Sequence, residues 1–167
     1  MRLEGRSRQI LELHVVGYEF QGVAGRALLA LGKLGVLRAL GFDHDANWLM
    51  VQGHASDGER EWDFRAPCML TTEAAELAEW LEEAARGSQD LGPTDFTEPN
   101  LEFRRTSAPP DPPVVRVTFR LEARPPWAPD ITQDEWDGVW LEFETSPDDL
   151  RNAAAQLRAA LDKYPRH

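Results

Sequence analysis

Four residues near the middle of the first half of the chain have types that bind divalent metals and could act together. Asp43, His44 and Asp45 stand together, and His54 follows further along. Carboxylates and imidazoles are common metal ligands, but this spacing matches no established metal-binding motif. If a strand has already begun at this point, His44 and Asp45 point to opposite sides of it. The pattern therefore favours a polar turn entering a strand, with a metal site as the alternative.

A nucleophile and several carboxylate pairs are the other chemical candidates. Cys68 needs a nearby histidine to activate it, and no Gly-rich elbow flanks it, so we expect a buried cysteine at a strand end. Glu98 with Glu102, and Glu142 with Glu144, could perform acid–base catalysis only in a cleft that separates their pKa values. The second pair shares one strand face, which indicates a solvated surface.

No Gly-rich phosphate-binding loop and no Ser-His-Asp arrangement in a recognisable context occurs in the sequence. The sequence therefore predicts no catalytic residue, no metal and no cofactor.

Residues 125–138 form a polar, Pro-rich stretch that carries two tryptophans beside four acids. Exposed aromatic residues with a charged rim are typical of binding hot spots. We predict a partner-binding site made of Trp127, Asp130, Asp134, Glu135, Trp136 and Asp137. The alternative is that both tryptophans fold back and cover the core.

Six segments show the apolar–polar alternation of half-buried strands. They are residues 8–16, 46–54, 61–69, 96–105, 115–121 and 139–143. Asp57 and Gly58 predict a tight turn between the second and third of these. Short turns join most of the strands, which indicates an antiparallel sheet.

Two further segments have the spacing of amphipathic helices. Residues 71–86 carry a stripe of Leu and Ala on one face. We expect Thr71 or Thr72 to cap the start of this helix and Gly87 to end it. Residues 147–163 follow Ser146 as N-cap, with Pro147 at the first position. The predicted fold is α+β: an antiparallel sheet of about six strands with two amphipathic helices (71–86 and 147–163) packed on it. Residues 1–167 are expected to form a single domain.

Composition narrows the kinds of partner. The chain has 167 residues, a formal net charge of −11 and a pI near 4.8. This charge disfavours nucleic-acid binding and suits a basic partner. A single cysteine allows no internal disulfide, and no N-terminal signal segment is seen, so we expect a cytoplasmic protein.

Residues 21–42 differ from the rest of the chain. They are rich in Leu, Ala and Gly, and Arg26, Lys33 and Arg38 argue against a membrane span. We interpret 21–42 as an insertion or a loop/helix element. Within it, 23–42 could be a contact segment for a partner, a membrane surface or a second copy of the chain.

Several motifs, taken in order, resemble the WapI-type immunity proteins of bacteria. The matching stretches are residues 11–20, 45–49, 62, 67–71, 80–81, 98–103, 121–122, 125–127 and 157–166. The resemblance implies a cytoplasmic, non-enzymatic antidote that binds a toxin delivered by a neighbouring cell. The founding member of the family is understood to neutralise a tRNA-cleaving toxin.

The hypothesis is thus a protein that binds and neutralises a basic polypeptide toxin, with a nuclease as the toxin class that the resemblance suggests. One alternative is an interaction or scaffold domain, with a homodimer joined through 23–42. A third is a hydrolase or small-molecule binder that uses the carboxylates or Asp43, His44 and His54.

Overall fold

The computed structural model describes residues 1–19, 47–129 and 138–166. In these ranges the strands form two antiparallel sheets, and each sheet follows the order of the chain. The first sheet contains β1 (Arg2–Glu4), β2 (Ile10–Tyr18), β3 (Trp48–Ser56) and β4 (Glu61–Leu70). The second contains β5 (Thr94–Asp95), β6 (Leu101–Arg105), β7 (Val114–Phe119) and β8 (Val139–Glu144).

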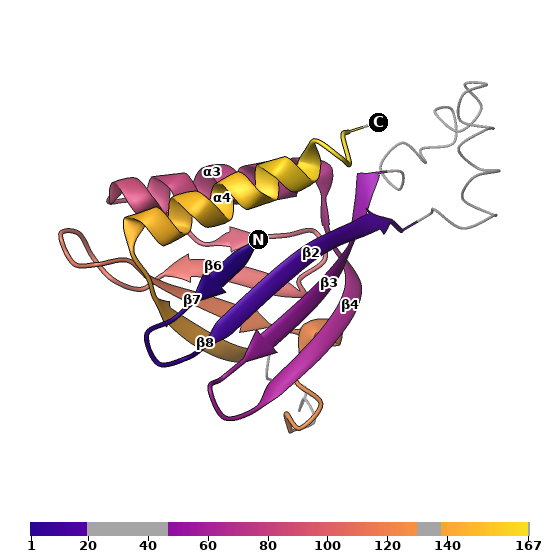
Figure 1. Ribbon diagram of the computed structural model, residues 1–167, viewed down its shortest axis with the longest axis horizontal. Helices are drawn as coiled ribbons and strands as arrows, with labels where there is room; N and C mark the ends of the chain where they lie inside the picture. The colour runs from indigo at the N-terminus through magenta and orange to yellow at the C-terminus, as the bar shows by residue number, and fades with distance from the viewer. Residues whose placement is uncertain (20–46, 130–137, 167) are drawn as a thin grey trace.

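Two helices, α3 (Thr71–Arg86) and α4 (Pro147–Leu161), lie side by side above both sheets (Figure 1). The predicted α+β class and both predicted helices are confirmed. The strands are divided between two sheets, whereas the prediction had them in one.

The core lies where the inner faces of the two sheets meet beneath the helices. Phe119 of β7 packs edge-on against Trp62 and Phe64, both in β4, with ring centroids 5.1 and 6.2 Å apart. Trp80 of α3 reaches Phe103 of β6, with centroids 6.4 Å apart. The helices and both sheets therefore share one apolar interior.

Helix α3 begins at Thr71, and its N-cap stands one residue before the two threonines predicted to cap it. Leu70 is the N-cap, and its N–H donates to Glu73 Oε2 at 2.7 Å. Glu73 Oε1 also accepts from the backbone and hydroxyl of Thr97, so this carboxylate satisfies donors from two segments. The expectation that Thr71 or Thr72 caps the helix is wrong, because Leu70 is the N-cap and the carboxylate of Glu73, in the first turn, accepts its N–H. Gly87 ends the helix at φ +79°, as predicted.

Helix α4 begins with the predicted cap. Ser146 Oγ accepts from the Asp149 N–H at 3.2 Å, and the Asp149 carboxylate accepts from the Ser146 N–H at 3.0 Å. This reciprocal pair is a capping box. The helix ends at Leu161, short of the predicted residue 163.

The strands differ from the prediction at their ends. β1 and β5 were not predicted, since they span only three and two residues. The alternation at 115–121 places Leu121 in a strand, which is wrong. β7 ends at Phe119, and Leu121 has φ +47° and begins the short 3-10 helix η2 (Leu121–Ala123). Leu121 is consequently exposed at the surface.

The segment 21–42 and residues Asp43, His44 and Asp45 lie outside the described residues, so their predicted roles stay predictions, as does the single-domain assignment. Neither helix in the described ranges combines the length and apolar character that a membrane crossing requires.

Candidate partner-binding surfaces

Trp127 is the one residue of the predicted binding site that the structure describes. Its ring stands edge-on to Trp62 at 5.5 Å between centroids, and the guanidinium of Arg60 lies 4.8 Å from its centre. The Trp62 indole N–H donates to the Ala123 carbonyl at 2.9 Å, which fixes the surface that Trp127 covers. Trp127 is still 37% exposed, so it covers the core and also presents an aromatic face to solvent.

The rest of that predicted site, Asp130, Asp134, Glu135, Trp136 and Asp137, lies outside the described residues. These five positions fall between Pro129 and Gly138, directly ahead of β8. Their role in binding remains a prediction.

The outer face of β6, β7 and β8 carries a second cluster of aromatic and charged side chains. Strand register aligns Glu102, Thr118 and Trp140 in one row across the sheet. The neighbouring row contains Arg104, Arg116 and Glu142. We call this set, with Arg120 at the end of β7, the Trp140 face.

Ion pairs order this face. Glu102 accepts from Arg120 at 2.8 Å and from Arg104 at 3.3 Å, and Arg116 pairs with Glu142 at 2.9 Å. Burial opposes ionisation of Glu102, yet the hydrogen bonds and charges of Arg120 and Arg104 hold the pKa of that carboxyl below its usual value.

Trp140 is the most exposed of the large apolar side chains in the described residues, at 50%. The guanidinium of Arg116 lies 4.3 Å from its ring centre, a cation–π contact that leaves much of the ring facing solvent. In the alternating segment 139–143, Trp140 falls on the polar side, but it is not one of the residues predicted to bind a partner. The signal was present, because a tryptophan among outward-facing glutamates stands apart from its neighbours.

The outer face of the first sheet is arranged differently. Register brings Arg2, Glu12, His54 and Asp63 into one row across its four strands, and the basic and acidic residue types alternate. His54 Nδ1 lies 2.9 Å from Asp63 Oδ1, and Arg2 pairs with Glu12. These side chains satisfy one another within the sheet.

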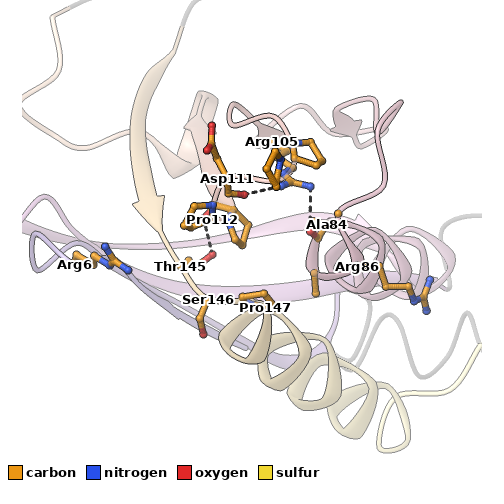
Figure 2. A pocket seen from close by; sticks show the side chains of 14 residues that line it. Arg6, Ala84, Arg86, Arg105, Asp111, Pro112, Thr145, Ser146 and Pro147 are labelled. Atoms are coloured by element: carbon orange, nitrogen blue, oxygen red, sulfur yellow. Dashed lines mark hydrogen bonds between the residues drawn. The ribbon is translucent and has the colours of Figure 1, made fainter.

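A cleft of about 490 Å³ lies between the end of α3, the start of α4 and the Pro-rich loop 106–113 (Figure 2). Arg105 joins its walls, donating to the carbonyls of Ala84 at 3.4 Å and Asp111 at 3.3 Å. Arg6 and Arg86 lie at opposite ends of the view and do not converge (Figure 2). Arg105 therefore links the Pro-rich loop to the end of α3. The arginines that line the cleft do not form a common binding site.

Three of the candidate catalytic residues, Cys68, Glu102 and Glu142, are buried or ion-paired. Cys68 is fully buried in β4, as predicted, and burial, with the charge of Glu122, raises the pKa of its thiol to about 12. Among the described residues, no group of three or more His, Cys, Asp or Glu side chains could hold a metal ion. The carboxylates Glu102 and Glu142 are paired with arginines.

A sheet face that presents a tryptophan among guanidinium and carboxylate groups is typical of proteins that bind another macromolecule. Residues 2–165 match the family described as the Immunity protein WapI-like family, and the chain belongs to this family. No curated protein and no solved structure matches the chain significantly.

Proposed function

We propose that this protein is a cytoplasmic immunity protein that neutralises a polypeptide toxin by binding it, without catalysis. Membership of the Immunity protein WapI-like family over residues 2–165 is the observation that carries the proposal. Neutralisation by binding needs only a tight interface, which agrees with the burial of Cys68 and the ion pairs of Glu102 and Glu142.

The net charge of −11 favours a basic toxin. Complementary fields speed the encounter of two proteins and disfavour wrong partners. A nuclease is the toxin class that fits this charge, since nucleases hold phosphates in cationic clefts that an acidic protein can occupy.

Within this proposal, the acids Asp130, Asp134, Glu135 and Asp137 meet the cationic surface of the toxin, and Trp127 and Trp136 are the aromatic anchors. The partial exposure of Trp127 supports its part in this set. The contact of its ring with Arg60 leaves it held in place before a partner arrives, which lowers the entropic cost of binding.

The test takes the product of the adjacent gene as the candidate toxin and measures its toxic activity against added immunity protein. We expect complete inhibition at one equivalent, and loss of inhibition when the four acids are replaced by alanine. Full inhibition by that variant would show that the four acids are not part of the interface, and the proposed function would still stand. Toxin activity that is unaffected by the wild-type protein would contradict the function itself.

The alternative is an interaction domain that dimerises through 23–42. This segment lies outside the described residues, so the distinction rests on light scattering of the full chain and of a chain lacking 23–42. A dimer that becomes a monomer on deletion would favour the alternative, and a monomer in both cases would exclude it.

A further inference from the structure

The Trp140 face places two like charges in paired strand positions. Arg104 and Arg116 lie directly opposite each other on β6 and β7. Like charges in directly opposed strand positions repel, in contrast to the alternating charges across the first sheet. Features that break a local rule of this kind are expected where function requires them.

The same side chains surround a hollow of about 350 Å³ in the sheet surface. Its lining residues are Glu102, Arg104, Arg116, Thr118, Arg120 and Trp140. Three guanidinium groups line the hollow beside the carboxylate of Glu102, which is largely covered, with 16% of its side chain exposed against 53% for Arg104. Arg116 also pairs with Glu142, so three arginines share two carboxylates, and they leave an excess of positive charge here in a protein of net charge −11.

Trp140 gives the hollow an apolar wall. Half of its surface is open, and Arg116 lies over the ring rather than beside it. Tryptophan and arginine are the residue types most often found at the energetic centre of protein interfaces.

From these observations we infer that the Trp140 face docks the toxin by receiving an acidic side chain, Asp or Glu, of that polypeptide in the hollow beside Trp140. The inference rests on the proposed function and adds a second contact to the acids at 130–137. A carboxylate fits because guanidinium groups bind it through paired hydrogen bonds, and a third charge of opposite sign relieves the repulsion between Arg104 and Arg116.

A polypeptide suits this hollow better than a nucleic acid. The overall charge of −11 repels a polyanion, whereas one acidic side chain on a basic protein meets only the local field. Residues 130–137 precede β8 directly, so the proposed acids and Trp140 are also close in the chain. The acids at 130–137 would contact basic groups of the toxin, and the hollow would contact an acidic one. A partner must satisfy both requirements, which gives specificity.

The experiment measures the affinity of the neighbouring toxin by calorimetry for the wild-type protein and three variants. Trp140→Ala removes the apolar wall, and Arg104→Thr removes the exposed cation while keeping a good strand former. Arg65→Thr is the matched control, since Arg65 is an exposed arginine on the outer face of the first sheet, opposite Gln52. The melting temperature of each variant is recorded alongside.

We expect Trp140→Ala to weaken binding by about thirtyfold or more and Arg104→Thr by about tenfold, with Arg65→Thr within about twofold of wild type. Arg104→Thr should melt at or above the wild-type temperature, because it relieves the repulsion. A purely structural role of Arg104 would lower the melting temperature instead. Unchanged affinity in both variants, with wild-type binding intact, overturns the docking surface and leaves the proposed function standing.

If the wild-type protein binds no toxin, the proposed function fails, and a short peptide that carries a single glutamate then tests the hollow alone. The readout is the indole N–H signal of Trp140 in an NMR titration, assigned with Trp140→Phe. A shift in the wild type that is lost in Arg104→Thr supports a carboxylate-binding hollow, and no shift at millimolar peptide overturns it.

Discussion

Gly53 lies beneath the ring of Phe64 in the neighbouring strand. The two residues are paired in the β3–β4 register, and a Cβ on Gly53 would be 2.0 Å from Phe64 Cζ. The ring of Phe64 in turn packs against Phe119 of the second sheet. Gly53 therefore lets an aromatic side chain lie flat across β3, and the contact between the two sheets depends on it.

Gly53→Ala should lower the free energy of unfolding by about 2 kcal/mol, since the added methyl must displace the Phe64 ring from a packed core. Urea unfolding measures this directly. Gly92→Ala is the control, because no atom lies within 4 Å of the position of its Cβ. Equal stability of the two variants would contradict the packing described for Phe64.

Cys68 should be unreactive in the native protein. Its side chain is fully buried, and burial raises the pKa of the thiol to about 12, so little thiolate forms near neutral pH. A thiol reagent such as Ellman's reagent is expected to label it only after unfolding in urea. Rapid labelling of the folded protein at pH 8 would show that Cys68 is accessible and could serve as a nucleophile.

Trp127 and Trp140 show how far a sequence can identify a binding site. Trp127 was selected because it stands in a polar, Pro-rich stretch, and it is partly exposed. Trp140 could have been found by its place among outward-facing glutamates. The sequence could not predict that Arg104 and Arg116 lie opposite each other. That pairing depends on the register between two strands, and residue spacing alone does not fix the register.

Among the elements, both helices were predicted well because their signals are local. A cap, an apolar stripe and a stop residue lie within each segment, as Ser146 and Gly87 illustrate. The division of the strands into two sheets was missed, because alternation tells which strands are half-buried and not which strands pair. Leu121 continues the apolar–polar alternation of β7. The strand nevertheless ends at Phe119, and nothing in the alternation predicts this end.

The N-cap of α4 gives a prediction at this scale. Ser146→Ala removes the acceptor for the Asp149 N–H and should lower the free energy of unfolding by about 1 kcal/mol. Ser146→Thr keeps a capping hydroxyl and should retain most of that stability. Chemical denaturation of both variants makes the comparison, and equal losses would show that the hydroxyl does not stabilise the helix.

For the whole molecule, acid should destabilise the fold. The hydroxyl and N–H of Ser146 lower the pKa of Asp149, and arginine contacts outweigh burial to lower that of Glu102. A carboxyl whose folded pKa is depressed contributes stability above its unfolded pKa, here near 3.8 for Asp and 4.5 for Glu. That contribution is lost as pH falls through the lower folded value.

The urea concentration at the midpoint of unfolding should therefore decrease as the pH is lowered below about 4.5, because these carboxyls become protonated. Asp149→Asn removes one titrating group and should flatten part of this fall, which separates its contribution from that of Glu102. A midpoint that rose on acidification would contradict the assigned direction of both pKa shifts.

The proposed function is tested most directly by the binding kinetics and dissociation constant for the product of the neighbouring gene, measured at low and high salt. We expect a one-to-one complex whose association rate falls steeply as salt rises, because an acidic protein attracts a basic partner over long range. Binding at one-to-one stoichiometry with no salt dependence would contradict the proposed role of charge. Absence of a complex at either salt concentration would contradict the immunity function.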